Sequence, residues 1–471
     1  MTVLSLDLGT TATKAVVWGD GGPLAVGRAT VSSSFPQPGW VEQDPRDWWA
    51  ALVAACAEVP CESVDTVVFS SARETFVPVD GGGEALGPAI VWSDRRADDE
   101  AQALAQEHGG QEVLRQRLGV IVDGGCPAAK VRWLLGHEPA LMSRARWVLS
   151  PRDYVVRRLT GVAVTDRTLA SRTGWYELDG SQVSWAPADL MPAVVPSTSV
   201  VADGLLAESA AALGLGRHVA VVIGAGDRAC EVLGSGAGDG APMVSWGTTA
   251  NVSVPVATPG TVPVGASCSA SALGGFLLEC GLSAAGAAMD WLSRVTGQPL
   301  ATLVSLAEAA PAGAGGVLAA PWFNGARAPW WDASARAAFT GLRTTLSLGD
   351  LARSLYEGVA MDVARSLEAL GVSPPRLAAS GGGAESRVWP GVLAAVTGVV
   401  VERRRPELAA SAGARFIAAA ATGASLGLDD INPVTEQVEP DPSWVSVYRA
   451  LRPEADAAST AVLGLGGRPT S

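Results

Sequence analysis

The stretch that decides the fold is DLGTTATK, residues 7–14. An apolar run precedes it and a β-prone run, residues 15–18, follows it, so the pattern predicts a β-hairpin with a polar tip. Glycine lets such a tip approach a ligand closely, and threonine hydroxyls and backbone N–H groups can donate to phosphate oxygens. A lysine adds a point charge and an aspartate at the strand end can hold a hydrated Mg²⁺, whereas an ordinary hairpin with a polar turn is the alternative interpretation. The candidate residues are Asp7, Gly9, Thr10, Thr11 and Lys14.

A second stretch, VSWGTTANV at residues 244–252, repeats the pattern of apolar strand, Gly-Thr-Thr and apolar strand. In this alignment Asp7 corresponds to Ser245, and Gly9 corresponds to Gly247. Internal similarity at so wide a spacing indicates two related domains, each opening with a phosphate-facing hairpin. Two such hairpins facing each other would bind a polyphosphate across a cleft. This arrangement resembles that of the actin-like ATPase superfamily.

Length and charge limit what the chain can be. Its 471 residues are long for one core and predict two or more domains, and 48% hydrophobic residues make it globular. The 47 acidic residues outnumber the 34 basic ones, for a formal net charge of −13, which argues against nucleic acid or an anionic membrane as a partner. ATP stays compatible, because phosphate binding needs only local donors and Mg²⁺.

Cysteine and histidine usage indicates reduced, buried thiols and argues against a zinc site. The six cysteines contain no CxxC pair, and only three histidines are present. No basic region precedes the first predicted strand, and the longest apolar run, residues 388–401, carries Pro390 and is too short to span a bilayer. We therefore expect a cytoplasmic protein.

Two segments carry groups suited to recognising hydroxyls. Arg73 and Glu74 follow a predicted strand, residues 65–69; arginine can donate a fork of hydrogen bonds and glutamate can accept from hydroxyls. The alternative is a surface ion pair. Trp92 ends another predicted strand, and its ring could pack on the C–H surface of a sugar, although core packing is the commoner role of such a residue.

Asp227 follows a five-residue apolar strand, residues 219–223, in a turn bracketed by glycines. Ligands of α/β sheets bind at the carboxyl ends of strands, so this carboxylate is a candidate for catalysis, with simple turn formation as the alternative. The Gly-rich segment 234–240 separates the turn from the second hairpin and is predicted to be the interdomain hinge.

Capping and glycine signals place further elements. A strand over residues 376–380 feeds three glycines and a helix from about Glu385 to Val396, which suits close approach of a nucleotide. Other helices are predicted for residues 44–58, 150–161 and 281–292.

Together these motifs resemble the FGGY carbohydrate kinase family over nearly the whole chain. Each motif is weak alone, but their order and spacing are specific. The resemblance implies an α/β fold with two actin-like (ribonuclease H-like) domains and a cleft between them: residues 1–240 on the sugar side and 241–471 on the ATP side. The matching motifs are the two Gly-Thr-Thr hairpins, Trp-x-Asp-Arg-Arg at Trp92, Gly-Asp at 226–227, Gly-Ala-Arg-Ala-Pro-x-x-Asp-x-x-Ala-Arg ending at Arg336, and Gly-Gly-Gly-Ala at 381–384.

The resemblance also implies an activity and a role for each candidate residue. The activity is ATP-dependent phosphorylation of a sugar or polyol hydroxyl, with ATP and Mg²⁺ as cofactors. Asp227 would be the general base that accepts the proton of the attacking hydroxyl, and Asp7 and Asp227 would lie near the Mg²⁺. The residues implied at ATP are Thr10, Thr11, Lys14, Gly247, Thr248, Gly286, Gly382, Gly383 and Ala384. Those implied at the acceptor are Arg73, Glu74, Trp92, Asp227, Arg228 and Asn251.

Two departures from the glycerol kinase pattern bear on the acceptor. Alignment puts Gly125 where glycerol kinases have a substrate-contacting Tyr, and Asn251 where they have a Phe that packs on the carbon chain. Losing both rings enlarges the pocket, and a buried amide needs hydroxyl partners. We therefore expect a ketopentose such as xylulose, with glycerol or another polyol as alternatives; Arg73 and Arg228 leave a sugar acid open.

Two other classes of protein stay open on the sequence. An actin-like or chaperone-like ATPase that serves as a binding module would share the hairpins but not the sugar pocket. A kinase-like protein without activity is the second, because Arg228 stands where many relatives carry a neutral amide. The sequence does not decide the oligomeric state, and a homodimer is one arrangement left open.

Overall fold

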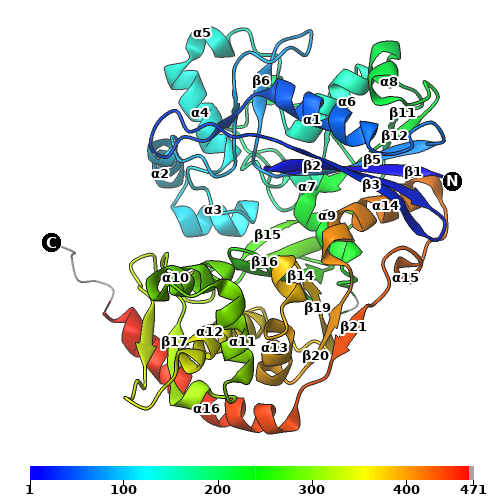
Figure 1. Cartoon of the computed structure of the whole chain (residues 1–471). Helices are drawn as coiled ribbons and strands as arrows, with labels where there is room; N and C mark the ends of the chain where they lie inside the picture. The colour runs from blue at the N-terminus through cyan, green and yellow to red at the C-terminus, as the bar shows by residue number, and fades with distance from the viewer. Residues whose placement is uncertain (239, 466–471) are drawn as a thin grey trace.

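The computed structural model describes residues 1–238 and 240–465, and the chain forms two halves that each contain a mixed β-sheet flanked by helices (Figure 1). The N-terminal sheet has the strand order β11-β12-β5-β1-β2-β3, and the C-terminal sheet has the order β15-β16-β14-β13-β19-β20-β21. The predicted pair of α/β units is therefore confirmed. The strands of these sheets are β1 (Val3–Leu8), β2 (Ala12–Gly19), β3 (Gly22–Thr30), β5 (Thr66–Ser71), β11 (Val200–Ala202), β12 (Ala220–Gly226), β13 (Met243–Trp246), β14 (Ala250–Val256), β15 (Ser267–Ala270), β16 (Phe276–Leu282), β19 (Arg376–Ser380), β20 (Val400–Arg403) and β21 (Glu436–Val438).

The remaining strands form four small two-stranded sheets, and the helices cover both faces of the two large sheets (Figure 1). The small sheets pair β4 (Glu42–Gln43) with β7 (Ala89–Ile90), β6 (Val77–Val79) with β8 (Trp147–Leu149), β9 (Val164–Asp166) with β10 (Ala193–Val195), and β17 (Leu318–Ala320) with β18 (Ala338–Thr340). The helices are α1 (Pro45–Ala57), α2 (Asp98–Glu107), α3 (Gln111–Leu118), α4 (Pro127–His137), α5 (Pro139–Met142), α6 (Pro151–Thr160), α7 (Arg167–Ala170), α8 (Ala207–Leu213), α9 (Asp227–Gly234), α10 (Gly286–Thr296), α11 (Leu300–Ala309), α12 (Leu348–Ala369), α13 (Trp389–Thr397), α14 (Ala409–Thr422), α15 (Leu428–Ile431) and α16 (Pro442–Leu463).

The two large sheets share a five-stranded core with the same pairing. In each half the centre of the sheet is an antiparallel hairpin, β1–β2 or β13–β14. A third antiparallel strand pairs with one side of the hairpin, and two parallel strands follow on the other side. The registers match as well: Asp7 lies opposite Ser70 on β5, and Ser245 lies opposite Ser380 on β19. The correspondence of Asp7 with Ser245, read from the sequence repeat, therefore holds in three dimensions.

Successive side chains of a strand point to opposite faces of the sheet, so each large sheet contributes to two hydrophobic cores, one on each face. On β1, Leu4 packs with α1 and its neighbours, whereas Val3 belongs to a core that α14 also enters. On β13, Val244 belongs to the core of the C-terminal half, whereas Met243 joins the same core as Val3. The sheet face that carries Met243 therefore turns toward the N-terminal half. Other residues that share this face by register are Ser245, Asn251, Ser253, Ser267 and Glu279.

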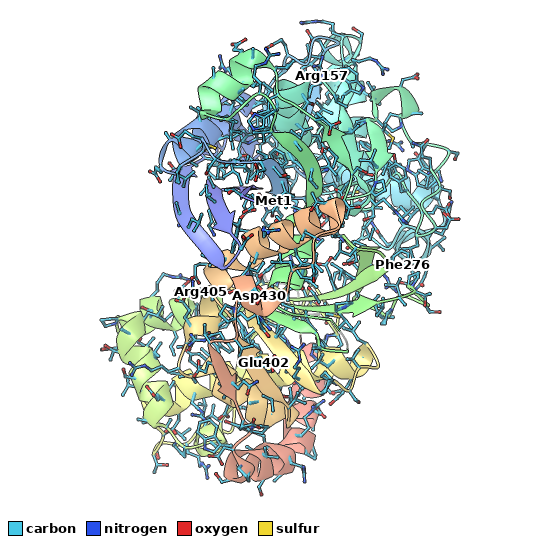
Figure 2. The ribbon with its side chains drawn as sticks, turned by 90° about the vertical axis from the view of Figure 1, so that its right-hand side faces the viewer. Met1, Arg157, Phe276, Glu402, Arg405 and Asp430 are labelled. Carbon is cyan, nitrogen blue, oxygen red and sulfur yellow. The ribbon has the colours of Figure 1, made fainter. Side chains whose placement is uncertain are left out.

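Helices α9 and α14 cross where the two halves meet. A Cβ on Gly234 would lie 1.8 Å from the carbonyl oxygen of Ala409, and one on Gly413 would lie 1.9 Å from that of Cys230, so only glycine permits this close approach. Figure 2 shows α14 in orange beside Met1, with Arg405 and Asp430 near the junction of the halves. Helix α14, late in the sequence, thus completes the core of the N-terminal sheet.

Several local predictions are confirmed. The predicted helix at residues 44–58 is α1, whose N-cap carboxylate of Asp44 accepts from the backbone N–H of Arg46. Helix α6 starts after Ser150, whose hydroxyl caps it, and ends at Gly161 with a φ of 82°. Within the described residues, no helix combines the length and apolar character needed to cross a membrane.

Three local predictions were wrong. Asp227 is not in a turn but is the first residue of α9, and Gly234, where the predicted hinge begins, is the last residue of this helix. Strand β16 includes residues 281–282, because their pairing with β14 outweighs the helix propensity of the alanines that follow. After Ser380 the chain forms a 3₁₀ turn, Gly382–Glu385, before α13. Part of the predicted hinge, Asp239, lies outside the described residues.

The helix crossing predicts an asymmetry between two glycine substitutions. Gly413→Ala should destabilise the protein by about 1–3 kcal/mol, because the added methyl group overlaps the Cys230 carbonyl oxygen. Gly136→Ala on α4 is the matched control: no atom lies within 4 Å of its added Cβ, so helix propensity should make it neutral or stabilising by up to about 1 kcal/mol. Urea denaturation measures both, and equal midpoints for the two variants would contradict the packing argument.

Candidate active site

Asp227 lies at the boundary between the two halves, where β12 ends and α9 begins, with 46% of its side chain exposed. Its Oδ1 accepts from the backbone N–H of Arg228 at 2.6 Å, and the Nε of Arg73 is 3.4 Å away. Partial loss of hydration between the two halves raises the pKa of Asp227 to about 6, against the opposing effect of Arg73 and Arg228 and with a further contribution from the charge of Asp7. A carboxylate with this pKa can accept a proton near neutral pH.

Asp7, at the end of β1, is the second carboxylate at this boundary. Its Oδ1 accepts from the hydroxyl of Ser70 at 2.8 Å. Burial raises the pKa of Asp7, whereas the Ser70 hydrogen bond and the charge of Lys14 lower it. Among the described residues, no three His, Cys, Asp or Glu side chains are grouped to hold a metal. Two carboxylates whose ionised forms are disfavoured by burial fit a Mg²⁺ that takes its other ligands from water and phosphate.

The first hairpin contacts both halves of the protein. The indole N–H of Trp92 donates to the hydroxyl of Thr10 at 3.2 Å, and 49% of Trp92 is exposed. The residue predicted at the sugar therefore touches a residue predicted at the phosphates. Lys14 is different, because its ammonium group donates to the backbone carbonyl of Glu407 and ties the hairpin to the segment before α14.

Three glycine-bearing segments of the C-terminal half, which are predicted to contact the nucleotide, lie together. The N–H of Gly286, at the start of α10, donates to the carbonyl of Gly247 at 3.0 Å, and a Cβ on Gly286 would lie 2.8 Å from that oxygen. A Cβ on Gly383 would lie 2.5 Å from the Cβ of Trp246. Gly382 differs, because no atom lies within 4 Å of its added Cβ. Thr248 is exposed at the hairpin tip, and Ala384 is buried beneath the loop.

Glu279, on β16 of the C-terminal half, was missed by the sequence reasoning. It is 4% exposed, and its two oxygens accept from Nη1 and Nη2 of Arg73 at 2.9 and 3.3 Å. Arg228 and Arg172 approach the same carboxylate at 3.6 and 4.0 Å. Burial alone would raise the pKa of Glu279, but Arg73 and Arg172 outweigh it and lower the pKa to about 2. The only signal in the sequence was one carboxylate within an apolar strand.

Glu74 and Arg172 form a second ion pair of the site. The Nε of Arg172 donates to Oε1 of Glu74 at 2.6 Å, and Lys130 donates to the Glu74 carbonyl at 3.4 Å. Glu74 has a φ of 57°, a conformation that costs a residue other than glycine about 1–3 kcal/mol. These contacts hold the strained residue beside Arg73.

Arg228 and Asn251, both predicted at the acceptor, have partners of their own. Nη1 of Arg228 is 2.7 Å from Glu231, whose other oxygen accepts from Ser245 and Ser380 at 3.0 and 2.7 Å. Glu231, also missed from the sequence, thus links α9 to β13 and β19. The Oδ1 of Asn251 accepts from the Ser253 hydroxyl at 2.8 Å, on the sheet face shared with Glu279.

Comparison with known proteins assigns the chain to a family. Residues 2–234 match the N-terminal domain of the FGGY family of carbohydrate kinases, and residues 243–422 match its C-terminal domain. The chain therefore belongs to the FGGY family of carbohydrate kinases. It is an ATP-dependent carbohydrate kinase, which replaces the alternative of an ATPase binding module.

The relatives divide between two acceptors. The chain is 32% identical over 449 residues to a glycerol kinase of Gloeobacter violaceus, covering 89% of this chain and 88% of that protein. It is 30% identical to a xylulose kinase of Klebsiella pneumoniae, covering 85% and 86%. The crystal structure of a xylulose kinase from Rhodospirillum rubrum superimposes with a TM-score of 0.90 at 29% identity, covering 99% of this chain and all of that one. Similarity alone does not decide the acceptor.

The open space at Gly382 predicts where ATP lies. Gly382→Ala meets no protein atom, so the melting temperature should not change, but a nucleotide lying over the loop would meet the new methyl group. We expect the dissociation constant for ATP to rise about tenfold, measured by isothermal titration calorimetry. Gly21→Ala, in the β2–β3 turn, also meets no atom and is the control. Equal ATP affinity in both variants would contradict this location.

Proposed function

We propose that this kinase transfers the γ-phosphoryl group of ATP to a hydroxyl of a ketopentose such as xylulose, with Asp227 as the general base. The observation that carries the proposal is the position of Asp227 at the end of β12, half exposed, between Arg73 and Arg228. Its pKa of about 6 suits a group that must be ionised at neutral pH and still take up a proton.

A sugar hydroxyl is a poor nucleophile until a base accepts its proton. Asp227 would accept that proton as the hydroxyl oxygen attacks the γ-phosphorus in line with the leaving oxygen. The tips of the two hairpins, with Thr10 and Thr248, would donate hydrogen bonds to the phosphates. Asp7 and Asp227 would hold a Mg²⁺, which when bound neutralises charge on the phosphates.

The charges of the site favour a neutral acceptor over a sugar acid. Each arginine near Glu279 already has a carboxylate within 3 Å: Arg73 pairs with Glu279 at 2.9 Å, Arg172 with Glu74 at 2.6 Å, and Arg228 with Glu231 at 2.7 Å. A substrate carboxylate would have to displace one of these partners. A polyhydroxy acceptor needs only hydrogen-bond donors and acceptors, which Arg73 and Glu74 supply.

Two positions that carry no aromatic ring, Gly125 and Asn251, support an acceptor longer than glycerol. A Cβ on Gly125 would lie 2.7 Å from the Trp92 carbonyl oxygen and 3.1 Å from Oδ1 of Asp123, so this backbone accepts no ring at that position. The amide of Asn251, whose carbonyl accepts from Ser253, can present its NH₂ group to an acceptor hydroxyl. Glycerol stays the second candidate, because the pair Arg73-Glu74 and Trp92 resemble the glycerol kinase pattern.

The pKa of Asp227 predicts the pH dependence. The base must be ionised, so kcat/KM for the acceptor should fall toward acid pH and level off above the pKa of Asp227, which is about 6 without metal and which a bound Mg²⁺ would lower. Asp227→Asn should lower the rate about 10²–10⁴-fold, remove this acid limb and leave ATP affinity largely unchanged. A coupled ATP-consumption assay between pH 5 and 8 tests both. Turnover like that of the wild type in the variant would exclude Asp227 as the base.

A panel of acceptors tests the proposed substrate class. At saturating MgATP, the highest kcat/KM should belong to a ketopentose or to a polyol of four to six carbons, with glycerol and gluconate lower. The same assay without an acceptor measures ATP hydrolysis as the background. If glycerol gives a higher kcat/KM than every ketose and longer polyol, the argument from Gly125 and Asn251 is wrong.

A further inference from the structure

One carboxylate of the C-terminal half, Glu279, faces arginines that all come from the N-terminal half. Arg73 follows β5, Arg172 follows α7 and Arg228 lies on α9. The hydroxyl of Ser269, on the neighbouring strand β15, also donates to Glu279 at 3.3 Å. The cluster is therefore one of the contacts between the C-terminal sheet and the N-terminal half, and it lies directly beside Asp227.

Two carboxylates compete for the guanidinium of Arg73. Glu279 takes both terminal nitrogens in a fork at 2.9 and 3.3 Å, whereas Asp227 has only a longer approach of 3.4 Å from Nε. The fork is the stronger arrangement, since two parallel charge-assisted hydrogen bonds fix the plane of the guanidinium. Burial strengthens it further, because Glu279 is 4% exposed whereas Asp227 is 46% exposed.

We propose that Glu279 is a positioning residue for phosphoryl transfer: it holds the terminal nitrogens of Arg73 away from Asp227, so that the Asp227 carboxylate stays open to the acceptor hydroxyl. The inference rests on the proposed role of Asp227 as the base. Without the carboxylate at position 279, Asp227 is the carboxylate that already contacts Arg73, at 3.4 Å from Nε, and the released terminal nitrogens can turn toward it. A forked pair between Arg73 and Asp227 would occupy the oxygens that must receive the proton.

The same cluster makes the acceptor site depend on the contact between the halves. Arg73 is aligned by a residue from the opposite sheet, so its geometry is complete only when β16 lies against the loop after β5. The nucleotide segments lie elsewhere on the C-terminal half, at Gly247, Gly286 and Gly383, and no contact joins them to Glu279 in the described residues. Loss of Glu279 should therefore affect acceptor use and spare ATP binding.

The test is Glu279→Gln, which keeps the shape and removes the charge. At saturating MgATP, kcat/KM should fall about 10- to 100-fold with the better of D-xylulose and glycerol, through kcat as well as KM. The dissociation constant for ATP, measured without acceptor, should stay within about twofold. The result is the ratio of variant to wild type on one acceptor, so it does not depend on which acceptor the wild type prefers. Wild-type kcat/KM, or equal losses in ATP binding and acceptor use, would overturn the proposal.

A matched control separates positioning from stability. Glu357, on α12 of the same half, is equally buried and pairs with Arg353 at 3.0 Å, far along the chain from the site. Glu357→Gln should lower the melting temperature but leave kcat/KM for the acceptor within about threefold. If it lowers kcat/KM as much as Glu279→Gln does, the effect of Glu279 is structural.

Should Glu279→Gln fail to fold, Glu279→Asp is the second variant. It keeps the charge and shortens the side chain by one methylene, so kcat/KM for the acceptor should fall by less than in Glu279→Gln while the dissociation constant for ATP stays unchanged.

A double-mutant cycle tests the coupling to Arg73. Arg73→Gln alone should reduce kcat/KM, because Arg73 belongs to the acceptor site. In that background Glu279→Gln should change kcat/KM by less than about threefold, since the group that Glu279 restrains is gone. Full multiplication of the two single effects would show that Glu279 acts independently of Arg73 and would contradict the proposal.

Discussion

A charged side chain buried between two halves of a protein must have partners, and the contact of Glu279 with Arg73 is the one on which the site depends. Removing one member of such a pair leaves an uncompensated buried charge, which commonly costs about 3–5 kcal/mol. Such a cost means that the contact favours the arrangement in which β16 lies against the loop after β5. It also brings a residue of the C-terminal half to within one side chain of Asp227, so that the proposed base and the tips of the two hairpins occupy one boundary.

Much of the fold could be predicted because its signals are local. The two hairpins can be recognised from a Gly-Thr-Thr repeat between apolar strands. The register of Asp7 with Ser70 and of Ser245 with Ser380 confirms that repeat. The caps at Asp44 and Ser150 are readable for the same reason. The role of Gly234 could not be predicted, because close helix packing and flexibility both select glycine and only the distant Ala409 distinguishes them.

The candidate site was predictable in part for a related physical reason. Asp227 ends a strand, and the carboxyl ends of strands are where such sheets bind ligands. Glu279 and Glu231 carry no motif, since their partners are far away in the chain: Glu279 pairs with Arg73 across 206 positions, and Glu231 accepts from Ser380 across 149. Lys14 shows the converse, because a residue inside a motif donates to Glu407, 393 positions later. Kinases that share this fold act on different acceptors, so the acceptor has to be argued from the residues of the site.

Asp227 is proposed to meet the acceptor hydroxyl while Glu279 keeps Arg73 in place. A crystal structure of the protein with D-xylulose and a non-hydrolysable ATP analogue tests both contacts at once. We expect an acceptor hydroxyl within about 2.6–3.2 Å of the Asp227 carboxylate, in line with the γ-phosphorus, and Arg73 still forked on Glu279. A complex in which Arg73 leaves Glu279 to pair with Asp227, or in which no acceptor hydroxyl reaches Asp227, would contradict it.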